Sequence, residues 1–270
     1  MPGRRGFMIL DANCAIGHWP FRRLWTTTAE GLLQMLDGAG IDRAVVCHTH
    51  AVFYRDPHAS NAELRDAVRP HRDRLIPLAA LAPDYAGWRD DLRQCVEEWG
   101  MRGLRLYPGY HRYDLGGDAA AELLAEAERL GLPVSVGCAF EDPRQRHPLD
   151  TAPDVTEHAI GAAARRFPGV RFLCTNAPLT TIDMVARHVP HQQNVCFDTS
   201  ALPGPLSDAI QQAYALLGPA RLLLGTHAPF KYPQVGLLRV HSLAGAAGAG
   251  PDAAALDAIL GQNALRLFGS

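Results

Sequence analysis

The chain has 270 residues, 47% of them hydrophobic and 20% charged, a balance that excludes disordered and fibrous proteins and suits one large globular domain. The formal net charge is only -2, so we expect neither nucleic acid nor an anionic membrane as a partner. No apolar run approaches the roughly 20 residues of a membrane span, and residues 1–6 lack the apolar core of a signal peptide, so we expect a cytoplasmic location.

The first predicted strand covers residues 8–17, an apolar run that ends at Gly17. Because side chains alternate along a strand, this run places Asp11, Asn13 and Ala15 on one face and the residues between them on the other. A strand with so few polar residues needs cover on both faces, as in a parallel sheet flanked by helices.

Strands and helices alternate along the rest of the chain. We predict further strands at 43–50, 75–81, 103–108, 133–139, 170–176, 194–200 and 221–227. Helical patterns follow the strands at 27–40, 61–69, 88–99, 119–130, 156–167, 181–188, 207–217, 235–243 and 252–267, with an alanine- and glycine-rich loop at 245–250. Eight strands, each followed by a helix, predict an α/β fold of the (β/α)8 TIM-barrel class, with residues 1–270 forming a single domain. Two flavodoxin-like halves would also alternate, but the sequence has neither a linker nor a glycine-rich phosphate loop after the first strand.

In a TIM barrel the functional residues lie at the carboxyl ends of the strands and in the loops beyond them. Several large aromatic residues fall at these positions, among them Trp19, Tyr107 and Phe140. They predict a roofed pocket that admits a small organic molecule and not a polymer.

Motifs at six places resemble the amidohydrolase-related branch of the amidohydrolase superfamily, whose members are TIM barrels. The motifs are at 10–17, 103–108 (Gly-Leu-Arg-Leu-Tyr-Pro), 132–134 (Leu-Pro-Val), 194–200 (Asn-Val-Cys-Phe-Asp-Thr-Ser), 221–229 (Arg-Leu-Leu-Leu-Gly-Thr-His-Ala-Pro) and 263–268 (Asn-Ala-Leu-Arg-Leu-Phe). The resemblance implies an enzyme that hydrolyses amide or lactone bonds, or decarboxylates aromatic acids, on small carboxylated or cyclic substrates.

The chain departs from this superfamily at the metal site. Members bind one or two divalent metals through a His-x-His pair at the first strand, histidines at the fifth and sixth strands and an aspartate at the eighth. The corresponding positions here are Asn13, Ala15, Gly137, Asn176 and His227. Alanine and glycine have no donor atom, and amides are poor zinc ligands, so we expect no metal cofactor at the usual position.

A relocated metal site is one hypothesis. His48 and His50 are two residues apart at the end of the second strand, so both can point into the barrel mouth, where His227 can approach them. Such imidazoles can bind zinc or another divalent metal. In the alternative interpretation, His48 faces the helix layer and only forms hydrogen bonds.

Catalysis without a metal is the other hypothesis. His227 takes the place of the superfamily's proton-transferring carboxylate and can act as an acid or base near neutral pH. We predict His111 and Asp142 as further catalytic residues. The predicted substrate-binding residues include two arginines that can hold a carboxylate, and are Arg105, Arg144, Tyr107, Asn13, Asn176 and Trp19. Alternatively, ion pairs of Arg144 with Asp142 and of Arg105 with Asp198 merely tie the loops together.

We therefore expect a hydrolase that cleaves an amide or lactone bond of a small carboxylated or cyclic molecule. A non-oxidative decarboxylase of a small aromatic acid is one alternative. A non-catalytic ligand-binding protein, which kept the barrel after losing its metal, is another. The expected partner is a small-molecule substrate, and assembly into a homodimer stays open.

Overall fold

The structure of the chain is a computed structural model that describes residues 7–189, 193–204, 206–245 and 250–269. Most of the predicted loop at 245–250 lies outside the described residues. All strand pairs that the structure describes are parallel. The strands are β1 (Leu10–Ile16), β2 (Arg43–His48), β3 (Leu75–Pro77), β4 (Ala79–Ala80), β5 (Leu104–Leu106), β6 (Val134–Gly137), β7 (Phe172–Thr175), β8 (Val195–Asp198) and β9 (Leu222–Leu223).

The strands close into a ring. Pairing runs from β1 through β2 to β3, and from β4 through to β9. Strands β3 and β4 are two parts of one strand, because the backbone N–H of Leu78 between them donates to Val46 O at 3.1 Å. At the other seam, Ala12 N donates to Leu224 O at 2.8 Å and Ala15 N donates to Ala228 O at 2.8 Å. The eight-stranded (β/α)8 barrel that the sequence predicts is therefore confirmed.

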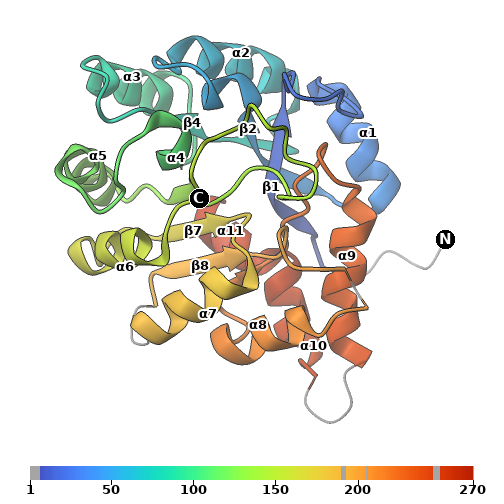
Figure 1. Cartoon of the computed structure of the whole chain (residues 1–270). Coiled ribbons are helices and arrows are strands. Elements are labelled where there is room, and N and C mark those ends of the chain that lie inside the picture. Colours follow the sequence, from blue (N-terminus) through green and yellow to red (C-terminus); the bar gives the residue numbers. More distant parts are fainter. Residues whose placement is uncertain (1–6, 190–192, 205, 246–249, 270) are drawn as a thin grey trace.

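Helices surround the ring, as Figure 1 shows. Thr28 begins the first helix by accepting a hydrogen bond from Gly31 N, and Gly40 ends it in the left-handed conformation at φ 73°. None of the described helices has the length and apolarity to cross a membrane. The helices are α1 (Ala29–Ala39), α2 (His58–Val68), α3 (Trp88–Arg93), α4 (Pro108–His111), α5 (Asp118–Arg129), α6 (Glu157–Arg166), α7 (Leu179–His188), α8 (Ala209–Leu217), α9 (Pro233–His241), α10 (Ala253–Asp257) and α11 (Asn263–Phe268).

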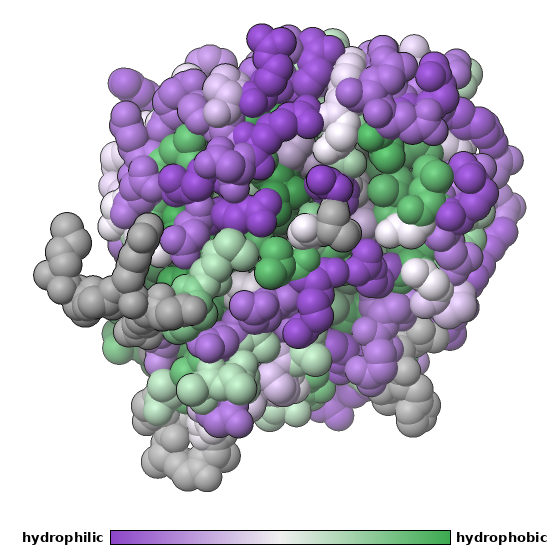
Figure 2. Space-filling view, turned by 180° about the vertical axis from the view of Figure 1, so that it is seen from behind, coloured by the Kyte–Doolittle hydropathy of each residue, from purple (hydrophilic) through white to green (hydrophobic). Residues whose placement is uncertain are grey.

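Helix α11 fills the end of the barrel where the strands begin. Its apolar side chains pack with inward-facing residues of the strands, forming one buried cluster that includes Leu10, Val45, Leu173, Leu223, Leu267 and Phe268. Figure 2 shows the molecule from behind the view of Figure 1, and hydrophilic side chains predominate on that face, with hydrophobic ones scattered among them. Because α11 and its apolar cluster fill the other end, the polar residues inside the barrel lie at the end where the strands finish.

Strand β1 does not keep the strict alternation that its sequence predicts. Its pairing with β2 shifts register between Asp11 and Cys14, as in a β-bulge. Asp11 accepts hydrogen bonds from Cys14 Sγ and from Thr226, which packs against Gly236 of α9. Asp11 thus lies on the helix side of the strand and does not share a face with Asn13, and this part of the prediction is wrong.

Candidate functional site

A buried polar network joins the carboxyl ends of β1, β7 and β8. The side-chain amide of Asn13 donates to Asn176 Oδ1 at 2.8 Å and to Asp198 Oδ2 at 2.7 Å. The other oxygen of Asp198 accepts from Asn176 N at 3.0 Å and from Ser200 Oγ at 2.9 Å. Burial raises the pKa of Asp198, while these hydrogen bonds act in the opposite direction. Residues far apart in the sequence are therefore fixed in one arrangement inside the barrel.

Two residues of the site adopt the left-handed backbone conformation that few residues other than glycine use. Asn176 follows β7 with φ 56°, and His227 follows β9 with φ 61°. Asparagine tolerates this conformation better than most residues, whereas for histidine the surrounding contacts must hold it. His227 N donates to Asn13 O at 2.9 Å, which ties the backbone after β9 to β1.

His227 is a neutral imidazole. Its Nε2 lies 3.3 Å from Asn176 Nδ2, and that amide nitrogen also donates to Ala139 O at 3.1 Å. Since the amide nitrogen is the donor, Nε2 accepts and the ring proton is on Nδ1. Burial, and then the positive charges of Lys231 and Arg105, lower the pKa of His227 well below its usual range.

Arg105 places a permanent positive charge inside the barrel. Its residue surface is only 3% exposed, and Nη1 donates to Ser135 Oγ at 2.8 Å and Nη2 to Asn13 Oδ1 at 3.4 Å. Its Nε is buried and has no hydrogen-bond partner among the described residues. A buried guanidinium with a free N–H group is suited to bind an anion.

The residues at the usual metal position do not fit a metal ion. Asn13 turns its amide nitrogen toward Asn176 and Asp198, and Ala15 has no donor atom. Gly137 faces the ring of Tyr107, since a Cβ at this glycine would lie 3.1 Å from that ring. The guanidinium of Arg105 beside Asn13 would also repel a divalent cation.

Aromatic side chains cover the network; we call Trp19, Tyr107, Phe140 and Phe230 the aromatic roof. Trp19 stacks on Phe140 with ring centres 4.5 Å apart, and His227 stacks on Phe230 at the same distance. All four roof residues are buried. In Figure 1 the yellow-green segment after β6, which carries Phe140, crosses over the strands. A ligand in the barrel would therefore contact flat aromatic faces.

Three predicted residues lie apart from the network. His111 is on α4, where its Nε2 lies 2.9 Å from Ala51 O and its ring meets Tyr107 edge-on. Arg144 donates to both oxygens of Asp142, at 3.0 and 2.6 Å, with its side chain 87% exposed. This contact holds the pKa of Asp142 at about 2, so Asp142 is ionised near neutral pH. The geometry favours the alternative interpretation, an ion pair within the loop.

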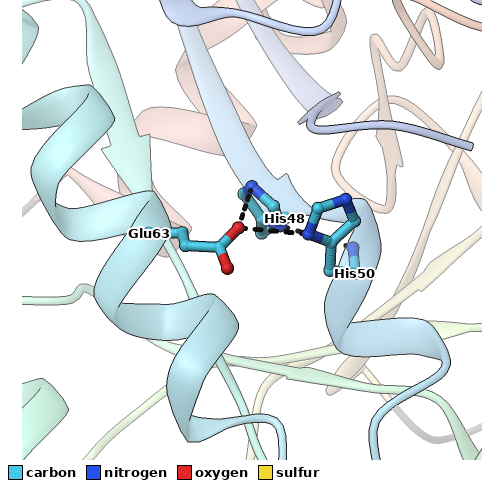
Figure 3. A group of neighbouring side chains, drawn as sticks. All are labelled: His48, His50 and Glu63. Carbon is cyan, nitrogen blue, oxygen red and sulfur yellow. Dashed lines mark hydrogen bonds and ion pairs between the residues drawn. The ribbon is translucent and has the colours of Figure 1, made fainter.

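The prediction that His48, His50 and His227 form a relocated metal site is wrong for His227. Val45 and Cys47 of β2 point into the barrel, so His48 points outward to the helix layer. There it meets His50 and, on α2, Glu63 (Figure 3). His227 instead lies in the barrel interior beside Asn176. The three ligand atoms of this outer group lie within 4.8 Å of one another, close enough to hold a metal ion.

Several residues of these sites were not singled out by sequence reasoning. The sequence gives Asp198 only the role of an ion-pair partner of Arg105, although Asp198 and Ser200 both lie at the end of the seventh predicted strand. Phe230 lies just past the eighth predicted strand, directly after the motif at 221–229. Glu63 gave no signal, because its meeting with His48 depends on how α2 packs on β2.

Comparison with known proteins identifies the family. Residues 28–270 match the family described as Amidohydrolase. The chain belongs to this amidohydrolase family. No curated protein matches it.

Solved structures with the same fold include three decarboxylases. The chain is similar to 5-carboxyvanillate decarboxylase from Sphingomonas paucimobilis (13% identity, 98% of this chain and 99% of that chain covered, TM-score 0.75). It is also similar to 2,6-dihydroxybenzoate decarboxylase from Rhizobium (16%, 98% and 99%, TM-score 0.72). A third is a dihydroxybenzoic acid decarboxylase from Polaromonas with bound manganese and the inhibitor 2-nitroresorcinol (14%, 97% and 97%, TM-score 0.73). At these identities the likeness shows a common fold.

Proposed function

We propose that this amidohydrolase-family protein binds a small aromatic carboxylate beneath the aromatic roof and removes its carboxyl group without oxidation. The buried guanidinium of Arg105, with its free Nε, is the observation that carries this proposal. The stacked rings above it suit a flat aromatic ligand. The decarboxylases among the similar structures support this reaction over the hydrolysis that we first expected.

The proposed reaction adds a proton to the ring carbon that bears the carboxylate. Arg105 holds the substrate carboxylate through N–H groups, and the substrate's negative charge favours protonation of the nearby His227 from solvent. His227 then transfers this proton to the ring carbon. The electron pair of the carbon–carboxylate bond returns to the ring as carbon dioxide leaves, and His227 is neutral again.

Substrate entry requires the aromatic roof to move. Trp19 is only 5% exposed and contacts the rings of both Phe140 and Phe230. The segment that carries Trp19 and the segment that carries Phe140 are joined by an ion pair between Arg22 Nε and Glu141 Oε1 at 2.6 Å. We infer that these two segments separate to admit the ligand and close again over it.

A substrate panel tests the proposed function. The purified chain is incubated with hydroxylated benzoates, and carbon dioxide release is measured; a parallel panel of amides and lactones is assayed for hydrolysis. We expect release from at least one benzoate, at least 100-fold slower in His227→Gln. Arg144→Met serves as the control and should keep full activity, because this arginine is exposed. Turnover only of amides or lactones would overturn the proposal, and so would binding of benzoates without any turnover.

A further inference from the structure

We propose that His48, His50 and Glu63 form a second, independent site that binds a transition-metal ion of the Zn²⁺ type on the outer side of β2. His48 Nε2 lies 3.3 Å from Glu63 Oε2, and His50 Nδ1 lies 3.1 Å from the same oxygen. In a tetrahedral zinc site with bonds of about 2.0–2.1 Å, ligand atoms are roughly 3.4 Å apart. The two nitrogen–oxygen separations are therefore close to those that such a site requires, and all three donor atoms lie within 4.8 Å of one another (Figure 3).

The three ligands come from consecutive elements that hold them in place. His48 ends β2, His50 lies in the one-turn helix Thr49–Val52, and Glu63 lies in α2. Gly17 packs tightly against His48, since a Cβ there would lie 2.8 Å from the imidazole Cε1. Only small movements of the side chains would then be needed to bind an ion.

The chemistry of the donors suits zinc. Two imidazoles and one carboxylate form a common ligand set for Zn²⁺, with a water molecule in the fourth position. Glu63 has 49% of its side chain exposed and His50 26%, so solvent can reach the ion from this side. His18, which is exposed, stacks against His50 with ring centres 6.2 Å apart.

One existing hydrogen bond must change when the metal binds. His48 Nδ1 accepts from His50 N at 3.3 Å, a long contact, so the ring proton is on Nε2 and points to Glu63. Metal binding at Nε2 requires the other tautomer of the neutral ring, so this proton moves to Nδ1 by exchange with solvent, and the hydrogen bond from His50 N to Nδ1 is lost. In the simpler alternative the cluster binds no ion, and Glu63 only accepts hydrogen bonds from the two imidazole rings.

Calorimetric titration of Zn²⁺ into the chelator-treated full chain distinguishes these roles. We expect one equivalent to bind, with affinity at least 10-fold weaker in His50→Ala and in Glu63→Gln. Both side chains are partly exposed, so these variants should fold, as circular dichroism can confirm. His71→Ala is the matched control, because His71 pairs with Glu30 at 3.4 Å and no third ligand joins them among the described residues.

A spectroscopic measurement identifies the ligands. Co²⁺ bound in place of zinc should give the visible absorption bands of a tetrahedral site in the wild-type protein and in His71→Ala, and these bands should be lost in Glu63→Gln. No binding of Zn²⁺, or binding that all the variants share equally, would overturn the proposal. Because His48 points away from the barrel interior, neither result bears on the proposed decarboxylation.

Discussion

Two neighbouring side chains, Arg105 and His227, set the charge inside the barrel. Arginine keeps its proton at any physiological pH, whereas burial keeps His227 neutral. The interior therefore contains a permanent cation together with the carboxyl group of Asp198, which already accepts four hydrogen bonds from Asn13, Asn176 and Ser200. An anionic ligand would accept the N–H of Arg105 Nε, which has no partner among the described residues.

Asp11 makes the stability of the protein depend on pH. Burial raises its pKa to about 6 from an ordinary 3.8, so the folded state holds a proton that the unfolded state releases between pH 4 and 6. Its contribution to stability is complete below pH 4 and is lost as the pH rises through 6, by about 3 kcal/mol. The difference in unfolding free energy between wild type and Asp11→Asn should therefore change by about 2 kcal/mol between pH 4 and 7, as urea denaturation can measure.

A control separates this effect from the other titrating groups. Asp66 has an exposed side chain that pairs with its neighbour Arg65 on the surface, so Asp66→Asn should show the same pH dependence as the wild type between pH 4 and 7. An unchanged difference between wild type and Asp11→Asn over this pH range would show that Asp11 is ionised in the folded protein.

Single residues were predicted well where the strand-end rule applies and poorly where packing decides. Asn13, Asn176 and His227 were expected at one end of the barrel, and hydrogen bonds join them there. The free Nε of Arg105 depends on where Ser135 and Asn13 lie, which no sequence pattern encodes. Glu63 likewise meets His48 only because of how α2 packs.

At the scale of elements, the two segments that cover the barrel depend on one partly buried ion pair. The Glu141 side chain is 1% exposed, and its Oε1 accepts from Arg22 Nε at 2.6 Å, while Oε2 has no partner among the described residues. We expect Glu141→Gln to cost about 1–3 kcal/mol of stability. Amide hydrogen exchange should become faster in residues 17–28 and 139–155, as mass spectrometry can measure.

An exposed ion pair provides the comparison. Asp183 and Arg187 form a pair on the surface of α7, so Asp183→Asn should leave exchange in the covering segments unchanged. Equal exchange in Glu141→Gln and the wild type would mean that the aromatic contacts alone hold the roof closed.

Helices and strands were predicted more accurately than their faces. Hydrophobic periodicity and caps such as Thr28 and Gly40 are local, so α1 was located to within about two residues at each end. The bulge in β1 adds a residue to one strand only, and it reversed the predicted face of Asp11. Strand faces depend on pairing with β2, which lies about 30 residues further along the chain.

At the scale of the whole molecule, the eightfold alternation was enough to predict a barrel, but not what its interior contains. The ring closes through hydrogen bonds between residues over 200 positions apart, such as Ala12 with Leu224. Closure brings Asn13 to His227 and Arg105. The guanidinium of Arg105 therefore lies beside a position where members of the superfamily place a metal ligand. The family's fold is kept while the charge inside it comes from a different source.

The central claim is that Arg105 binds a carboxylate inside the barrel, and paired calorimetric titrations test it most directly. The titrations compare hydroxybenzoates with the matching hydroxybenzamides, which have the same shape without the charge. We expect the wild type and Arg144→Met to bind a hydroxybenzoate at least 10-fold more tightly than its amide. Arg105→Met should lose this preference, and Arg105→Lys should keep part of it. Equal affinity for acid and amide in the wild type, or an undiminished preference in a folded Arg105→Met variant, would contradict the account.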